Sequence, residues 1–295
     1  MNNIRYFLKL FIFWLIYFCI NRLFFITVYI DEFLQFGSDE WLRIFLKSLP
    51  LDISFIAYLA TIISIFLFFN SFTLRKQINI FISEFIYWIN ILFIVLSSLV
   101  IGCEISLYSE WSTKLNFNAL RHLSNPSEVL LTATYGNYFI MLIAVCIAVL
   151  FIKFYSIFVH QKFISIRYYY SNLLVKVMKI PIVLGIFLLL IRGGLQEIPI
   201  NLSDAYFSKN IIVNDVTVNP NWNLIQNLLK NKTNFKGNPY KKYPQESVNR
   251  FIESIQQNND STINVINTQQ PNIVFILLES WSADVIESLG GLQAV

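Results

Sequence analysis

Long apolar runs constrain this chain more than any other feature of its sequence. A helix needs roughly 20 apolar residues to cross about 30 Å of hydrocarbon. Runs that meet or approach this length lie at residues 6–28, 51–69, 85–103, 138–152 and 177–191. The fourth run reaches full length only if its helix continues past Lys153, and the fifth is short and contains Pro181. We therefore predict an α-helical polytopic membrane bundle of about five transmembrane helices.

Composition divides the chain near Leu195. Over the whole sequence 56% of residues are hydrophobic and 14% are charged, whereas soluble domains average about 45–50% and about 25%. The apolar excess lies before residue 196, and the segment that follows is rich in Asn, Gln, Lys and Ser. The predicted organisation is a transmembrane domain over residues 1–195, an extracytoplasmic linker with short helices over 196–270, and the start of a further domain over 271–295.

Charged residues around the apolar runs predict the orientation of the chain in the membrane. Basic residues gather in alternate flanking segments and are Arg5, Lys9, Arg75, Lys76, Lys153, Lys162, Arg167, Lys176 and Lys179. Acidic residues gather in the other flanks and are Asp31, Glu32, Asp39, Glu40, Glu104, Glu110 and Glu128. Because cytoplasmic loops carry an excess of Lys and Arg, we expect the N-terminus inside and the part after the fifth run outside. The net charge of +4 lies on these flanks and not on one soluble face, which argues against a nucleic-acid partner.

Charged residues within or beside the predicted spans are candidates for a role in the membrane part. Arg22 lies inside the first run, so its side chain has either to snorkel to the interface or to face a partner helix. Asp52 stands at the edge of the second run, and Glu104 and Arg192 follow the third and fifth. All three are expected near the outer face. Such residues either belong to a functional site or are ordinary interfacial residues, and the sequence leaves both roles open.

Outside the spans, the sequence predicts further local structure. Residues 107–137 mix aromatic and aliphatic residues with charges, which indicates an amphipathic helix in the outer interface. After the bundle we expect an extended chain, because residues 211–218 alternate in polarity and Pro220 follows. Helices are predicted at residues 222–229 and 244–257.

Residues 273–278 form a continuous apolar run of strand length that ends in Glu279. Such a run is typical of a strand that is buried on both faces of a parallel sheet. Ligands bind beyond the carboxyl ends of these strands, and a carboxylate there suits an oxygen-ligated divalent cation. A polar residue at a strand end can equally face solvent or cap a helix, so the residues alone leave both roles for Glu279 open.

Two segments resemble a known family. The sequences PNIVFILLESWSADVIESLGG (271–291) and RGGLQEIPINLSDAYFSKNIIVNDVTVNPNWNL (192–224) are similar to parts of lipoteichoic acid synthase-like membrane proteins of the sulfatase/alkaline phosphatase superfamily. The first resembles the opening of their catalytic domain, and the second resembles the segment that joins membrane and catalytic parts. The resemblance implies a five-helix membrane part followed by an extracytoplasmic α/β sulfatase-like domain. It also implies a multi-pass protein of the bacterial inner (cytoplasmic) membrane with its C-terminal part in the periplasm.

The same resemblance implies an activity. It makes Glu279 a ligand of a divalent metal ion, Mn²⁺ or Mg²⁺, and implies a membrane-anchored phosphoglycerol (phospho-headgroup) transferase with a phosphatidylglycerol-like donor. The Thr nucleophile of the family and a later Asp-His pair correspond to positions beyond Val295. We therefore expect an N-terminal fragment with a truncated catalytic domain and no activity by itself.

Alternatives remain open at this level. A phosphoethanolamine transferase or a sulfatase-like hydrolase would share the same metal-binding start, and a non-enzymatic polytopic membrane protein is a separate class. A transporter is not indicated, because the predicted spans carry no charged residue in their middle and the sequence has no internal repeat. The sequence identifies neither the substrate and acceptor nor the oligomeric state.

Overall fold

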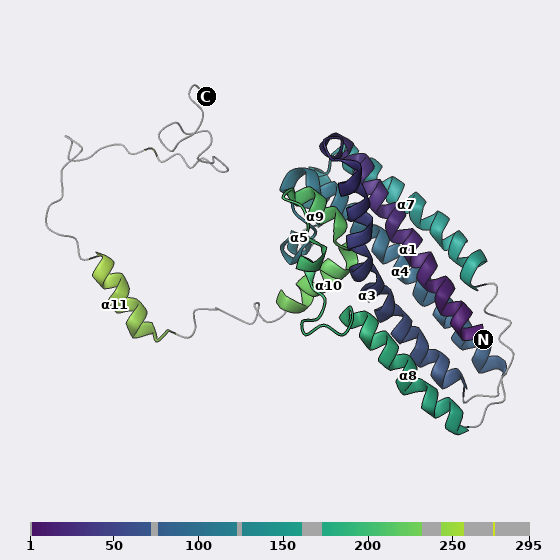
Figure 1. Ribbon diagram of the computed structural model, residues 1–295. Coiled ribbons are helices and arrows are strands. Elements are labelled where there is room, and N and C mark those ends of the chain that lie inside the picture. The colour runs from purple at the N-terminus through teal and green to yellow at the C-terminus, as the bar shows by residue number, and fades with distance from the viewer. Residues whose placement is uncertain are drawn as a thin grey trace, which may run out of the picture. The chain divides into compact units, whose positions relative to one another are not determined.

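A computed structural model describes residues 2–71, 76–122, 126–160, 173–231, 243–256 and 274 of the chain. The chain divides into two compact units, Met1–Lys236 and Gly237–Val295. The first unit is a helical bundle (Figure 1). In the second unit the described helix is α11, Gln245–Gln256, which confirms the helix predicted at residues 244–257.

Within the described residues, four helices are long and apolar enough to cross a membrane. They are α1 (Asn2–Val28), α3 (Ser38–Ser71), α4 (Lys76–Trp111) and α7 (Tyr135–Tyr155). The helix of α7 continues as a π-helical turn, η1 (Ser156–His160), which supplies the length past Lys153 that the fourth apolar run lacks. The prediction of a helical membrane bundle is confirmed for these four helices.

The fifth apolar run forms α8, Leu173–Arg192, which contains Pro181. The helix lies along α3 (Figure 1). The Ser54 hydroxyl of α3 donates to the carbonyl oxygen of Ile191 in α8 at 2.8 Å. On the side of α1, the rings of Phe7 and Phe187 meet edge to face at 5.2 Å. An apolar helix therefore occupies the fifth predicted span.

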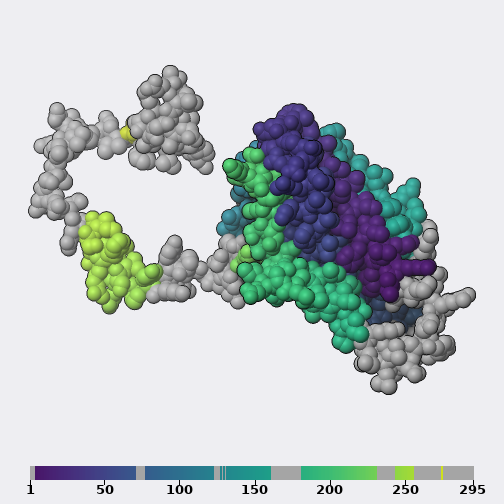
Figure 2. Space-filling model, viewed as in Figure 1, coloured from purple at the N-terminus to yellow at the C-terminus, as the bar shows by residue number. Residues whose placement is uncertain are grey.

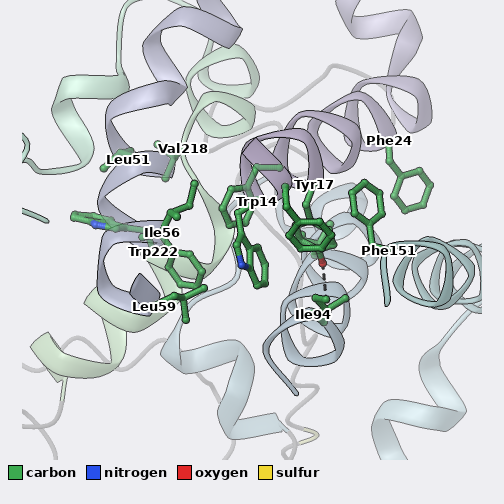
Figure 3. Close-up of a cluster of buried hydrophobic side chains, with 14 of the residues drawn as sticks. Trp14, Tyr17, Phe24, Leu51, Ile56, Leu59, Ile94, Phe151, Val218 and Trp222 are labelled. Carbon is green, nitrogen blue, oxygen red and sulfur yellow. Dashed lines mark hydrogen bonds between the residues drawn. The ribbon is translucent and has the colours of Figure 1, made fainter. Parts of the chain in front are cut away.

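Aromatic side chains form the middle of the bundle core. The ring centroids of Tyr17 and Phe151 lie 5.0 Å apart in an edge-to-face arrangement, and those of Trp14 and Tyr17 lie 5.2 Å apart. The close-up in Figure 3 shows Trp14, Tyr17 and Phe151 in this cluster, with the hydrogen bond from Tyr17 to Ile94 as a dashed line. Edge-to-face pairs contribute about 0.5–1.5 kcal/mol beyond their buried area. The Tyr17 hydroxyl is satisfied by the hydroxyl of Ser98 at 2.7 Å, so the core holds a large ring without an unpaired hydroxyl there.

Close packing of α4 against α7 depends on Gly102. A Cβ at this position would lie 3.0 Å from the sulfur of Met141 and 3.1 Å from the Cβ of Ala144. We expect Gly102→Val to lower the free energy of unfolding by about 1–3 kcal/mol, because overpacking forces the helices apart. Reversible unfolding by SDS in mixed micelles would measure it. Gly185→Val in α8, where a Cβ meets nothing within 4 Å, should have little effect, and equal losses for both variants would contradict the packing argument.

The connection between α4 and α7 differs from the single amphipathic helix predicted at residues 107–137. The helix α4 extends to Trp111, and two short helices follow, α5 (Phe117–His122) and α6 (Pro126–Thr132). The left-handed backbone of Ser112, with φ 48°, ends α4 and reverses the chain. Leu115 and Ala119 are then buried against Leu224. The prediction failed because these apolar residues pack on protein instead of lining one face of a continuous helix.

The segment after α8 is helical where we predicted extended chain. It contains a 3₁₀ turn, η2 (Leu202–Ala205), then α9 (Ile211–Thr217) and α10 (Pro220–Asn231). The side-chain oxygen of Asn214 accepts hydrogen bonds from the backbone of Phe207 and Ser208, both at 2.9 Å, which folds the entry to α9 onto its first turn. The predicted helix at residues 222–229 is confirmed within α10.

These helices lie against the end of the bundle that is opposite to the N-terminus (Figure 1). We call this end, at which Arg22, Asp52 and Glu104 lie, the polar end. The space-filling view shows α8, α9 and α10 in green as a continuous surface beside α3 (Figure 2). The sequence prediction also lacks a short helix after α1. This helix, α2 (Ile30–Phe33), joins α1 to α3.

The predicted strand at residues 273–278 and its terminal Glu279 lie outside the described residues, apart from Val274, which has no regular secondary structure. The helix expected after Glu279 lies outside them as well. No sheet occurs in the part of the chain that the structure describes. The α/β start of a second domain therefore stays a prediction.

Candidate functional site

A buried ion pair joins α1 to α3 at the polar end. The Arg22 Nη2 atom lies 3.1 Å from Asp52 Oδ2, and the two side chains are 4% and 3% exposed. Arg22 also donates from Nε to the carbonyl oxygen of Val216 at 3.0 Å and from Nη2 to that of Thr217 at 3.4 Å. The sequence left open whether Arg22 snorkels to the interface or faces a partner helix. The structure shows that it faces partners, in α3 and in α9.

We predicted Asp52 at the edge of the second span, but the residue lies well inside a helix. The helix α3 begins at Ser38, so the apolar run that starts at residue 51 covers only its later part. The second oxygen of the carboxylate, Oδ1, accepts a hydrogen bond from the side-chain amide of Asn219 at 2.8 Å. The carbonyl oxygen of the same amide accepts the backbone N–H of Trp222 at 3.1 Å in the first turn of α10. Asp52 thus holds Asn219, the residue that precedes α10 and accepts a hydrogen bond from its first turn.

A second ion pair joins the end of α4 to the loop after it. Lys114 Nζ lies 2.6 Å from Glu104 Oε1, and the side chains are 9% and 3% exposed. The other carboxylate oxygen of Glu104 accepts the backbone N–H of Leu115 at 3.3 Å. Lys114 also donates to the carbonyl oxygens of Asp215 at 2.9 Å and Val218 at 3.3 Å. Each ion pair therefore binds the backbone of α9 or of the residue that ends it.

Asparagine side chains complete the attachment of α10. The Asn221 amide donates to the hydroxyl of Ser97 at 2.6 Å, and the Asn223 amide donates to the carbonyl oxygen of Leu115 at 3.0 Å. Asn219, Asn221 and Asn223 are all buried. Sequence reasoning missed these asparagines and Lys114. For the asparagines, the available signal was their alternation around Pro220.

Asp215 is the carboxylate of this network without an ion-pair partner among the described residues. It is 7% exposed, and its Oδ2 accepts a hydrogen bond from the hydroxyl of Tyr108 at 2.9 Å. Burial raises the pKa of Asp215, and the charge of Lys114 and the hydrogen bond from Tyr108 oppose that rise only in part.

The raised pKa of Asp215 gives an expected pH dependence. A carboxyl group whose pKa is higher in the folded state stabilises that state at low pH, and the contribution is lost as pH rises through the folded pKa. Between the ordinary pKa of 3.8 and neutral pH, the wild type should therefore lose more stability on raising the pH than Asp215→Asn does. Unfolding by SDS across this range would measure the difference. Parallel pH profiles for the two proteins would contradict the assignment.

Two of the three predicted outer-face residues belong to this network, and the third does not. Arg192 lies at the end of α8, where its Nη2 atom donates to the carbonyl oxygens of Gln196 at 2.9 Å and Glu197 at 2.6 Å. These exposed bonds close the turn through Gly193 and Gly194, which have φ of 84° and 132°. Arg192 therefore shapes the exit from the bundle and is separate from the buried network.

The buried network is suited to holding one part of the chain against another. Its members are Arg22, Asp52, Glu104, Tyr108, Lys114, Asp215 and Asn219. Burying so many charged groups is costly unless each has partners, and here α9 and α10 supply several of them. We infer that the segment after the membrane helices is an integral part of the bundle.

The described residues contain no group of three or more His, Cys, Asp or Glu side chains that could hold a metal ion. Glu279, the metal ligand implied by the resemblance, lies outside the described residues.

No protein-family model matches the chain, and the searches of curated proteins and of solved structures found no match.

Proposed function

We propose that the chain is the membrane part of a phospho-headgroup transferase of the sulfatase superfamily, with residues 192–224 as the mount for an extracytoplasmic catalytic domain. The proposed donor is a phosphatidylglycerol-like lipid, and the proposed location is the bacterial inner membrane with the C-terminal part in the periplasm. The proposal rests on the resemblance of residues 192–224 and 271–291 to lipoteichoic acid synthase-like proteins, together with the way the first of these segments is held.

The observation that supports this proposal most directly is the attachment of α9 and α10 to the polar end. A plain membrane anchor needs no ordered structure after its last helix. Here Arg22, Lys114 and Asp52 bind backbone and side chains of residues 215–219 from buried positions. Such a mount would fix the height and direction in which the chain leaves the membrane. An enzyme that acts on lipid headgroups needs its catalytic groups at a defined position above them.

Residues further along would carry the chemistry. In this proposal Glu279 helps to hold Mn²⁺ or Mg²⁺, which when bound would stabilise negative charge on phosphoryl oxygens. The polar end itself contributes position and not catalysis, since its charged groups already bind one another.

Lipid turnover tests the proposal. The full-length protein would be reconstituted with phosphatidylglycerol and Mn²⁺, and release of diacylglycerol with transfer of phosphoglycerol is expected. Parallel reactions with phosphatidylethanolamine and with a sulfate ester distinguish the two related activities. Absence of turnover in all three reactions would contradict an enzyme of this superfamily and support a non-enzymatic membrane protein.

Orientation is tested separately. Lys209 and Arg5 are both exposed and lie in different parts of the first unit. In a variant without Cys19, Cys103 and Cys146, we expect Lys209→Cys to react with a membrane-impermeant maleimide in intact spheroplasts. Arg5→Cys, the matched control, should react only after permeabilisation. The reverse pattern would show that the protein has the opposite orientation in the membrane.

A further inference from the structure

A small cavity lies at the polar end between α1, α4 and the residues that join α9 to α10. Its volume is about 20 Å³. Phe18 and Phe25 supply apolar walls, and Val216 and Pro220 close it on the side of α9 and α10. Three polar side chains also line it: Asn21, Arg22 and Glu104. The cavity therefore lies between the two ion pairs of the network.

Asn21 has an unsatisfied atom in this cavity wall. The side chain is 3% exposed, and its Nδ2 atom donates to the carbonyl oxygen of Tyr17 at 2.8 Å. That bond fixes the orientation of the amide, since the nitrogen has to face Tyr17. The opposite atom, Oδ1, has no hydrogen-bond partner within the described residues. A buried acceptor in this state costs about 1–3 kcal/mol, so a partner in the cavity would be favourable.

The two charged residues of the wall have free hydrogen-bonding capacity. Arg22 uses Nε and Nη2 in its bonds to Val216, Thr217 and Asp52, and in the described part of the chain Nη1 makes none. Each carboxylate oxygen of Glu104 accepts one bond, from Lys114 or from Leu115, and each has a second lone pair. The wall of the cavity thus holds one donor, Arg22 Nη1, and two kinds of acceptor, Asn21 Oδ1 and the Glu104 carboxylate.

We propose that this cavity binds a single water molecule that joins the two ion pairs. The water accepts a hydrogen bond from Arg22 Nη1 and donates to Asn21 Oδ1 and to the Glu104 carboxylate. A buried water needs about 10–15 Å³ and two to four polar partners, and the site meets both requirements. It is too small for a phosphate or a lipid headgroup, and the guanidinium in its wall disfavours a metal cation.

The water connects the network across the bundle, from Asp52 and Arg22 to Glu104 and Lys114. Because Val216 and Pro220 form one wall, the site exists only while α9 and α10 are attached. Occupancy of the water site is therefore also a measure of this attachment, and it does not depend on the proposed enzymatic function.

Radiolytic hydroxyl labelling in nanodiscs tests the proposal, because radicals formed from a bound water oxidise the side chains beside it. Phe18 and Phe25 line the cavity, whereas Phe13 is buried in the core and does not line it. In the wild type we expect oxidation of Phe18 and Phe25 above that of Phe13. Equal oxidation of the three residues would show that the cavity is dry and would overturn the proposal.

Two variants sharpen the test. Asn21→Leu removes the orienting acceptor, and Ile101→Phe fills the cavity from α4; both should abolish the excess oxidation at Phe18. Asn90→Leu is the matched control, since Asn90 is also buried and donates to the carbonyl oxygen of Ile86 at 2.9 Å but does not line the cavity. Excess oxidation that persists in folded Asn21→Leu, or that disappears in Asn90→Leu, would contradict the site. The comparison within the wild type stands even if a variant fails to fold.

Discussion

Replacing Arg22 by Met is expected to lower the free energy of unfolding by about 3–5 kcal/mol, the range measured when one partner of a buried ion pair is removed. Methionine fills most of the space of the arginine but leaves Asp52 buried at 3% exposure without its cation. It also removes the donors to the carbonyl oxygens of Val216 and Thr217. Unfolding by SDS in mixed micelles measures the loss, and proteolysis after α8 should become faster as α9 detaches.

Arg43 provides the matched control on the protein surface. It pairs with Asp39 one turn earlier in α3, and the two side chains are 56% and 72% exposed. Exposed pairs of this kind contribute about 0–1 kcal/mol after solvent screening, so Arg43→Met should change stability little. Similar losses for Arg22→Met and Arg43→Met would show that burial of the Arg22 pair has no energetic consequence.

A double variant separates the unpaired charge from the lost packing. Arg22→Met together with Asp52→Leu removes both charges, so the penalty of an isolated buried carboxylate disappears. We expect it to recover part of the stability lost in Arg22→Met. Recovery should be incomplete, because Asn219 loses its acceptor and the carbonyl oxygens of α9 remain without Arg22. A double variant less stable than Arg22→Met would contradict this account.

The membrane helices were predictable from the sequence because hydrophobic length decides them. Each of the four long helices contains one of the predicted apolar runs. Their ends were not predictable in the same way. The helices α3 and α4 continue through polar residues such as Asp52 and Glu104, which count against a span in a hydropathy window but are satisfied by partners in the fold.

The contacts between side chains at the polar end could not be predicted from local sequence. Arg22 meets Val216 across a separation of 194 residues, and Lys114 meets Asp215 across 101. No periodicity carries such information. Alternation at residues 211–218 predicted an extended chain, yet these residues form α9, because their apolar side chains pack on α1 and α3 and Asn214 orders the turn before them. Tertiary contacts here outweigh the weak local preference for an extended chain.

In the full-length protein, Glu279→Gln is expected to reduce phosphatidylglycerol turnover to the level of a lipid-only control. The change keeps the size of the side chain and removes the negative charge that a divalent cation requires. Mn²⁺ affinity, followed by electron paramagnetic resonance of the free ion, should fall in the same variant, which separates loss of metal from loss of fold. Glu287→Gln is the matched control, since this carboxylate follows in the same segment and has no part in the proposed site. Turnover and Mn²⁺ affinity of Glu279→Gln that equal those of the wild type would remove Glu279 from the metal site. Such a result would mean that the resemblance at residues 271–291 does not extend to metal binding. The buried network at the polar end is tested independently by the Arg22 and Asp215 measurements.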